Sequence, residues 1–227
     1  MVCKNCLVVS AAIVVACVGG AIAFAQNEKP KAPPSNPHAN NPHAAPQGQP
    51  EMKLPKGWTM EDMQACMVAG TPGEQHQFMA SHAGTWHGKE TMWMGPDSEA
   101  MNTTCTAVNT SLLDGRFVRV NVNSEMPGMG PFMGEGTYGY DNVSGKYVCS
   151  WIDSMSTGFS TGTGELSADK KTMTWNFTFN CPITKKPAMM REVDTFKSEN
   201  EMTMEMFGND PKTGKEFKMI HIDYTRK

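Results

Sequence analysis

The sequence has little excess charge of either sign and almost no long apolar run. Its 227 residues carry 20 Lys and Arg against 23 Asp and Glu, which gives a formal net charge of −3. A chain without a basic excess lacks the electrostatic footprint of a nucleic-acid-binding domain. Charged residues make up only 19% of the chain, and the one long apolar run lies within residues 1–25. The composition therefore also excludes a coiled coil and a multi-span membrane protein.

Close cysteine pairs are missing outside the first 25 residues. The rest of the chain holds four cysteines, Cys66, Cys105, Cys149 and Cys181, and no C-x-x-C pair. Zinc clusters need such close pairs, so no metal site is predicted from cysteine. The metalloprotease pattern H-E-x-x-H is also missing, and no catalytic residue is identified. An unrecognised enzyme remains an alternative, and binding is favoured over catalysis.

Residues 1–25 are predicted to be a secretory signal peptide. Lys4 provides the positive start, residues 7–23 carry no charge, and Ala23–Ala25 forms an A-x-A cleavage site. Two alternatives remain open: a bacterial lipobox ending at Cys17, which would carry a lipid anchor, and an uncleaved anchor. We expect a secreted or periplasmic protein without a membrane span after cleavage, with a lipoprotein as the alternative.

An oxidising compartment makes disulfides possible among the four remaining cysteines. Four cysteines allow three pairings, and the sequence does not decide between them. We favour a bond between Cys66 and Cys181, because both lie outside predicted strand interiors. Cys105 and Cys149 fit small buried hydrophobes equally well.

Composition divides the rest of the chain into three parts. Residues 26–57 are rich in Pro, Asn and Ala and cannot bury a core, which predicts a disordered linker. Residues 58–83 are predicted to hold short helices, the first begun by a capping box in which Thr59 is followed by Asp62. Residues 84–227 are predicted to form a β-barrel domain that is preceded by these helices.

The pattern changes from period 3.6 to period 2 after Gly84. In residues 171–179, Met, Trp and Phe alternate with Thr and Asn, as in a strand with one buried face. Turn residues separate such runs, and no gap is long enough for a helix. An all-β, antiparallel up-and-down barrel of about ten strands is predicted, because closure removes the sheet edges. The expected runs are 85–94, 100–110, 116–125, 132–140, 145–153, 157–166, 171–180, 188–197, 201–207 and 215–226.

Two short motifs at the ends of this region resemble the calycin pattern of lipocalins, fatty-acid-binding proteins and nitrobindin-like barrels. Gly84-Thr85-Trp86 opens the first strand, and Arg226 lies in the last. The resemblance implies that the Trp86 ring plugs one end of the barrel and that Arg226 lies across the indole to complete the closure. A guanidinium over an indole contributes about 0.5–2 kcal/mol.

Longer segments are similar to the bacterial domain-of-unknown-function family 1579. They include AGTWHG, MWMGPDSEAM, LLDGRFVRV, GYDNVSGKYVCSWIDSMSTG and DPKTGKEFKMIHIDYTRK. The similarity covers about residues 72–227. It implies a calycin-like barrel from a bacterium, and it supplies neither a reaction nor catalytic residues.

If Trp86 and Arg226 both face the interior, strand alternation predicts which other side chains do so. A barrel of about ten strands is wide enough for a cavity, although a packed core is the alternative. We expect a small apolar or amphipathic ligand inside it, with an anionic head group at Arg191 or Arg226. The predicted ligand-binding residues are Trp151, Trp175, Met204, Arg191, Ile222 and Tyr224.

Two further binding hypotheses involve cofactors, although none is predicted outright. The likeness to nitrobindin-like barrels implies haem ligation by His221, but alternation turns His221 outward unless a β-bulge intervenes. The 20 methionines include Met-x-Met and Met-x-x-Met spacings that fit Cu(I) or Ag(I). Residues 126–131 form the best exposed candidate for that ion, and methionine as a core filler is the alternative.

Overall fold

A computed structural model describes residues 54–227 of the chain, which form two short helices followed by ten strands. The predicted signal peptide, the lipidation site at Cys17 and the predicted linker as far as residue 53 lie outside the described residues. No helix within residues 54–227 has the length and apolar character that a bilayer span requires.

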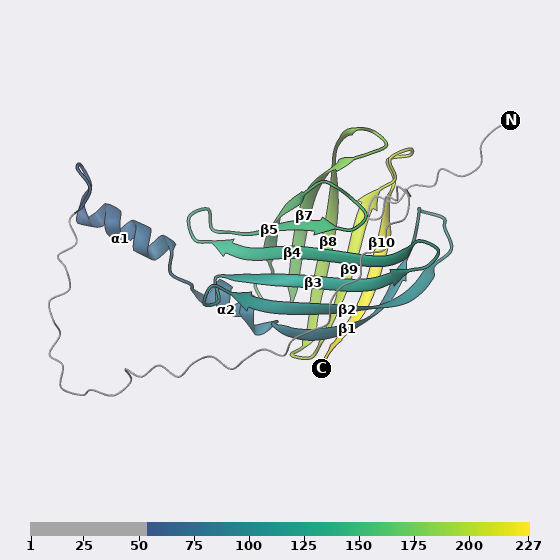
Figure 1. Ribbon diagram of the computed structural model, residues 1–227, viewed down its shortest axis with the longest axis horizontal. Helices are drawn as coiled ribbons and strands as arrows, with labels where there is room; N and C mark the ends of the chain where they lie inside the picture. Colours follow the sequence, from purple (N-terminus) through teal and green to yellow (C-terminus); the bar gives the residue numbers. More distant parts are fainter. Residues whose placement is uncertain (1–53) are drawn as a thin grey trace, which may run out of the picture. The chain divides into compact units, whose positions relative to one another are not determined.

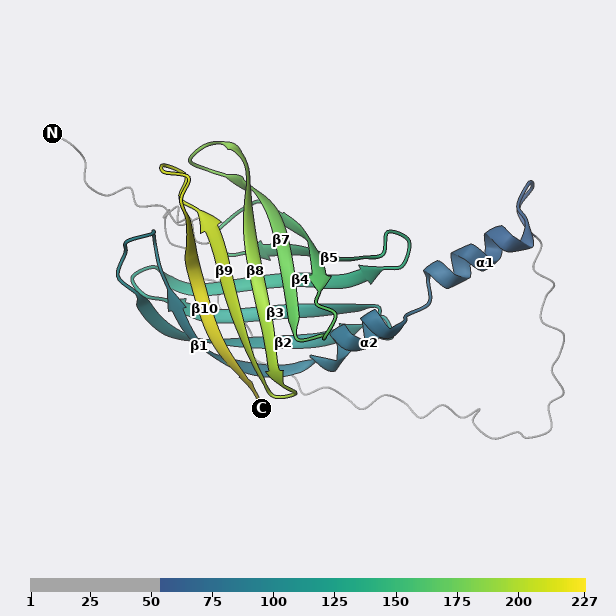
Figure 2. The ribbon, with the colours of Figure 1, turned by 180° about the vertical axis from the view of Figure 1, so that it is seen from behind.

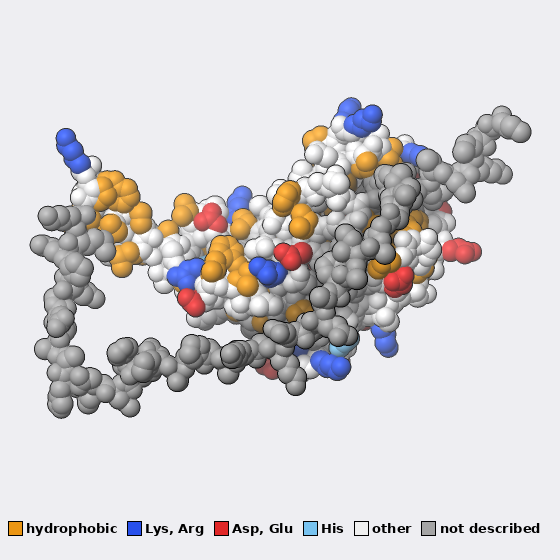
Figure 3. All heavy atoms as spheres, in the orientation of Figure 1, with side chains coloured by type: hydrophobic (Ala, Val, Ile, Leu, Met, Phe, Trp, Pro, Cys, Tyr) orange, Lys and Arg blue, Asp and Glu red, His pale blue; other side chains and the backbone are white. Residues whose placement is uncertain are grey.

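The first helix, α1 (Met60–Ala69), begins with the predicted cap. The Thr59 hydroxyl accepts a hydrogen bond from the backbone N–H of Asp62 at 3.1 Å, and the Asp62 carboxylate accepts one from the N–H of Thr59 at 2.8 Å. No α1 side chain is buried, and apolar side chains gather over it (Figure 3). The chain divides into two compact units, with most of α1 in the smaller one and Val68–Lys227 in the larger.

Ten antiparallel strands form a closed barrel in the larger unit (Figures 1 and 2). Each strand pairs with the next along the chain, and β1 also pairs with β10, which confirms the predicted up-and-down architecture. The strands are β1 (Gly84–Met92), β2 (Met101–Leu112), β3 (Phe117–Met126), β4 (Gly130–Asp141), β5 (Lys146–Asp153), β6 (Ser160–Leu166), β7 (Thr172–Cys181), β8 (Lys186–Ser198), β9 (Glu201–Asn209) and β10 (Glu216–Arg226).

Strand β7 shows why this sequence forms a barrel wall. Met173, Trp175 and Phe177 are each at most 3% exposed, whereas the alternating Asn176 and Thr178 face solvent. Burying one face of each strand removes its large apolar side chains from water, which is the main favourable free energy of folding.

Two tryptophans pack directly on glycines of the neighbouring strand. A Cβ atom on Gly134 would lie 2.1 Å from the Trp151 ring, and one on Gly164 would lie 2.6 Å from the Trp175 ring. Real Cβ atoms do not approach so closely, so these positions admit glycine alone unless the indoles move. The missing side chains let two large rings lie against the wall of the barrel.

The end of the barrel next to α2 (Glu74–Ser81) is closed by Trp86, and we call this end the floor. Trp86 is 1% exposed, and its indole N–H donates to the carbonyl of His82 at 3.0 Å. Arg226 lies opposite Trp86 in the β1–β10 register, with its guanidinium carbon 4.6 Å from the indole centroid. The same guanidinium donates to the Ser81 carbonyl at 2.8 Å. The floor thus joins the first strand, the last strand and the end of α2.

The opposite end, which we call the mouth, is surrounded by methionine. Strand β1 ends at Met92, β2 begins at Met101 and β3 ends at Met126. Met92 and Met126 are buried, and further methionines pack against them. Floor and mouth therefore differ in chemistry, with aromatic and guanidinium groups at one end and thioethers at the other.

The floor contacts predict a specific role for the last arginine in stability. Arg226→Met removes the stacking on Trp86 and the hydrogen bond to Ser81, and we expect the free energy of unfolding to fall by about 1–3 kcal/mol. Urea unfolding followed by circular dichroism measures the change. Arg119→Met is the matched control. Arg119 is half-exposed and forms a long surface ion pair with Glu135, at 3.9 Å, which contributes little to stability. Equal losses in the two variants would contradict this account of the floor.

Candidate functional site

Five of the six predicted ligand-binding residues lie on the inner face of the barrel. Trp175, Ile222 and Tyr224 are buried, with exposed fractions of 3%, 3% and 7%. Met204 is the cross-strand partner of Ile222 and packs against the same cluster, and Trp151 packs against the cluster that contains Trp175. These aromatic, aliphatic and thioether side chains pack together in the interior, and the described pocket lies nearer the mouth.

Arg191 was predicted as an inward-facing anchor, and the structure corrects this. Its guanidinium lies on the outside, 3.2 Å from the carboxylate of Glu216 and 4.2 Å from the centroid of the Phe207 ring. The next residue, Glu192, is buried instead, and strand alternation turns Arg191 to the opposite face.

Two carboxyl groups on β8 take the interior positions that sequence reasoning missed. Glu192 and Asp194 are 8% and 9% exposed. Glu192 lies between Trp175 and Met206 in the sheet, and Asp194 lies between Met173 and Met204. The sequence of residues 190–194, M-R-E-V-D, contains both acids. Strand alternation alone does not decide whether residues 191 and 193 or residues 192 and 194 face the interior.

Burial dominates the protonation of this pair. Loss of solvation raises the pKa of Asp194 to about 7, against a smaller lowering by a hydrogen bond from the Trp175 indole. Loss of solvation also raises the pKa of Glu192 well above its usual value, and the charge of Asp194 raises it further. Within residues 54–227, Glu192 makes no hydrogen bond. Buried carboxyl groups normally have polar partners, so this one is available to a ligand.

Aromatic rings surround the carboxyl pair. The Tyr138 ring meets the Trp175 ring edge-on, with the centroids 5.1 Å apart. Burial raises the pKa of the Tyr138 phenol, and the charges of Glu192 and Asp194 add to the effect. A neutral phenol and an indole beside the two acids give an apolar wall with a small number of polar groups.

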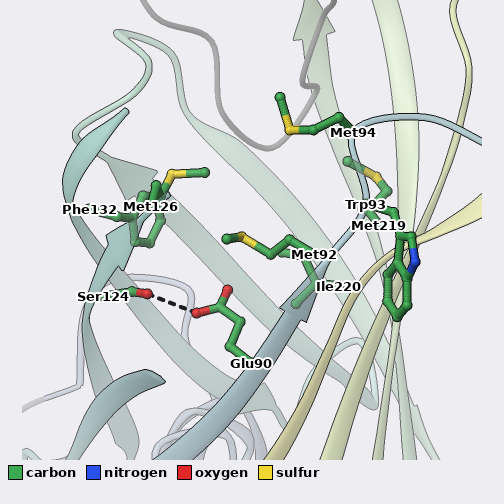
Figure 4. A pocket seen from close by; sticks show the side chains of 9 residues that line it. All are labelled: Glu90, Met92, Trp93, Met94, Ser124, Met126, Phe132, Met219 and Ile220. Carbon is green, nitrogen blue, oxygen red and sulfur yellow. Dashed lines mark hydrogen bonds between the residues drawn. The ribbon is translucent and has the colours of Figure 1, made fainter. Parts of the chain in front are cut away.

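A third carboxyl group lies nearer the mouth, in the pocket drawn in Figure 4. Glu90 is 7% exposed and accepts a hydrogen bond from the Ser124 hydroxyl at 2.8 Å. Burial raises the pKa of Glu90, and the Ser124 hydrogen bond lowers it by a smaller amount. Methionines line the rest of this pocket, together with Trp93, Phe132 and Ile220.

The interior groups do not match the anionic head group that the sequence suggested. No Lys or Arg of residues 54–227 is fully buried. Arg226 is engaged at the floor with Trp86 and Ser81, and Arg191 lies outside. The inward polar groups are carboxyl and phenol groups, which favour a hydrogen-bond donor or a cation.

His221, the histidine considered for haem, also lies on the outer face. Its ring nitrogens are 3.2 Å from Glu205 and 3.3 Å from Asp223. The β1–β10 register is continuous from His221 to Arg226, and the irregularity in β10 falls between Lys218 and Ile220 instead. The alternation is therefore not reversed, and His221 is not positioned to ligate iron inside the barrel.

The four described cysteines are free thiols, so the predicted Cys66–Cys181 disulfide is not formed here. Cys66 is exposed, whereas Cys181 is buried. Cys105 and Cys149 are buried in the barrel wall, and loss of solvation raises the pKa of Cys105 to about 11. The Cys105 thiol donates to the Tyr224 hydroxyl at 3.5 Å, which fits the structural role considered for it.

The described part of the chain holds one match to a hydrolase motif, but the local fold does not support that chemistry. Residues 158–162 read G-x-S-x-G, but Ser160 begins β6 and is followed by strand, whereas a nucleophile elbow needs a strand-to-helix turn. Within residues 54–227, no three His, Cys, Asp or Glu side chains are grouped so that they could hold a metal ion.

Comparisons with known proteins agree with the barrel. The sequence matches the family model described as protein of unknown function, DUF1579, over residues 71–226. A search of curated proteins gave no match. Among solved structures, the crystal structure of Rv2717c from M. tuberculosis superimposes with a TM-score of 0.54 and 10% sequence identity. That alignment covers 69% of this chain and 99% of the other, and at this identity it shows a shared fold alone.

The raised pKa of Asp194 predicts a pH-dependent stability difference. The folded state keeps this carboxyl protonated up to a pH of about 7, whereas in the unfolded chain it ionises near the ordinary aspartate pKa of 3.8. The contribution of Asp194 to stability is thus present below that window and is lost as the pH rises through it. We expect Asp194→Asn to become more stable relative to the unmodified protein from pH 4 to pH 8, by about 1.4 kcal/mol for each pKa unit.

Thermal unfolding of both proteins across this pH range measures the effect. Asp114→Asn is the control, because the Asp114 side chain is fully exposed. A constant difference between Asp194→Asn and the unmodified protein at all pH values would show that Asp194 is not protonated when folded.

Proposed function

Because the chain belongs to the DUF1579 family, whose name assigns no activity, the function has to be argued from the barrel interior, and we propose that it binds a small, mostly apolar ligand there. The ligand lies against the aromatic wall that contains Trp151, Trp175 and Tyr138. Its polar end is an amine or a hydroxyl that donates to Glu192 and Asp194.

The buried state of Glu192 is the observation that supports this function most strongly. The Glu192 carboxyl is 8% exposed and makes no hydrogen bond within residues 54–227, and its oxygens are not among the atoms that are completely buried without a partner, so it carries a partial desolvation cost that no described donor offsets. A ligand that donates to it removes part of that cost on binding. Proteins retain such unfavourable arrangements mainly at functional sites.

The surroundings of the pair define the rest of the ligand. Trp175 is 3% exposed and Met173 2%, and Met204 and Met206 approach from β9. Thioethers and aromatic rings adapt to hydrocarbon of irregular shape. The proposal is therefore an amphipathic molecule with one donor group, which is narrower than the apolar or amphipathic class that the sequence suggested.

Three probes of equal chain length test this function: dodecylamine, dodecanol and dodecanoate. We expect the amine and the alcohol to change tryptophan fluorescence and raise Tm, and dodecanoate to bind at least tenfold more weakly. Glu192→Gln, which cannot ionise to pair with a bound ammonium group, should weaken amine binding about tenfold, an effect of about 1.4 kcal/mol. Glu135→Gln is the control on the outer face, where Glu135 is half-exposed.

Either of two results would overturn the proposal. One is the absence of binding by all three probes. The other is preferential binding of dodecanoate, which would show that the interior carboxyl groups do not select the polar end.

We also propose that the protein acts outside the cytoplasm, on the strength of the leader in residues 1–25. Protein purified from a bacterial host is expected to have lost the leader, with Gln26 at its N-terminus. Intact-mass spectrometry measures this. A mass that fits a lipidated Cys17 would establish the lipoprotein alternative, and an unprocessed chain would contradict export through a cleaved signal.

A further inference from the structure

Methionines from separate parts of the chain meet at the mouth of the barrel. Met92 and Met126 are 5% and 6% exposed and form the centre of this group. The side chains packed against them include four more methionines, so that β1, β2, β3 and three loops all contribute thioethers. These four are Met94, Met101, Met129 and Met155.

A pocket lies among these side chains (Figure 4). Met92, Met94, Met126 and Met219 line it, and their sulfur atoms lie around the hollow with the Glu90 carboxylate at its edge. Its volume is about 50 Å³, which is enough for an ion and a few water molecules but not for a lipid chain.

The backbone of β10 departs from a regular ladder to place one of these sulfurs. The register of β10 against β9 shifts between Lys218 and Ile220, so that Met219 is an extra residue in a bulge. Met219 is 3% exposed and lines the pocket beside Ile220. Gly208 leaves room for it, because a Cβ atom there would lie 2.5 Å from the Met219 sulfur.

Two backbone hydrogen bonds fix the end of β1 and the turn that follows it. The backbone N–H of Trp93 donates to the carbonyl of Met219 at 2.8 Å, which ties β1 to the bulge. The backbone N–H of Met94 donates to the Ser98 hydroxyl at 2.8 Å, which fixes the turn that follows. A core that only needed apolar volume does not require this arrangement, since leucine fills such space with better-defined rotamers.

The chemistry of the group points to one class of ligand. Thioethers are soft, neutral donors that select Cu(I) and similar ions over the harder divalent metals. Glu90 provides one carboxylate beside them, which balances the charge of a monovalent cation in a buried place. We propose that Met92, Met94, Met126 and Met219, together with Glu90, form a binding site for a soft monovalent cation, Cu(I) or Ag(I).

This site is independent of the ligand proposed for the interior. It uses side chains at the mouth, whereas Glu192 and Asp194 lie midway along β8. It also differs from the exposed loop of residues 126–131 that the sequence favoured, because only Met126 of that loop lines the pocket. In the structure, residues 126–131 comprise the end of β3, a three-residue turn (127–129) and the start of β4.

Silver(I) is the probe for the test, because it needs no reductant. The full chain is used with the substitutions Cys3→Ser, Cys6→Ser, Cys17→Ser and Cys66→Ser, so that these four thiols do not compete for the ion. Its methionine methyl groups are labelled with ¹³C and observed by NMR during the titration. We expect the signals of the four pocket methionines to shift together and to saturate at one equivalent.

Variants assign these signals and measure the contribution of the pocket. The double variant Met126→Leu/Met219→Leu keeps the apolar volume nearly constant. It is expected to bind Ag(I) at least tenfold more weakly in competition with a chromogenic chelator. Met189→Leu, at a position 64% exposed on the outer face, is the control and should bind like the parent chain.

Shifts confined to other methionines, or no shift at all, would overturn the proposal, and that result does not depend on how the variants fold. Unchanged affinity in the double variant would overturn it as well. Binding of dodecylamine by the double variant separates the two proposals, since the interior ligand does not use these sulfurs.

Discussion

Closure of the sheet through β1 and β10 is the constraint on which the rest of the structure depends. The register between these strands is continuous from Trp86–Arg226 at the floor to Met92–Ile220 at the mouth. A closed sheet has two faces and no edge, so every strand must commit alternate side chains to the interior. The indole of Trp86, held by Arg226 and the His82 carbonyl, fills one end of that interior. The chemistry of the protein is then set by what lies between the floor and the mouth.

A barrel of ten strands encloses more space than one of eight, and in this protein methionine side chains and large indoles fill much of that space. Methionine accounts for 20 residues of the chain, and large indoles lie over glycines of the adjacent strand. The flexible methionine side chain fills space of irregular shape, whereas the indoles pack tightly on the glycines of the adjacent strand. The carboxyl groups of Glu192 and Asp194 do not serve that purpose, because their burial raises their pKa values and costs free energy. Their retention is more readily explained by binding than by stability.

The sequence was sufficient for the strand number, the closure and the family, because alternation over ten segments and the motifs at both ends are long-range patterns. It failed at residues 190–194, where a charged residue occupies both phases of the strand. Packing against Trp175 and Met206 decides that Glu192 faces in and Arg191 faces out, and a single sequence does not contain that contact. The bulge at Met219 was equally hidden, since β-bulges have no strong sequence signal when they lack glycine. The grouping of Met92, Met126 and Met219 follows only once the register of three strands is known.

The electrostatic character of the interior links the two binding proposals. Burial raises the pKa of Tyr224 most, and the charges of Glu90 and Glu192 add to it, so acids near the mouth and midway along the barrel act on the same phenol. No buried Lys or Arg of residues 54–227 offsets them. Buried acids with raised pKa values lose their protons most readily when a cation lies beside them, so a bound cation and an ionised lumen acid stabilise each other. The two proposed ligands, a soft monovalent ion at the thioethers and an amine at the β8 pair, are therefore both cations that bind beside a buried acid. The donor atoms next to each acid determine which cation binds there.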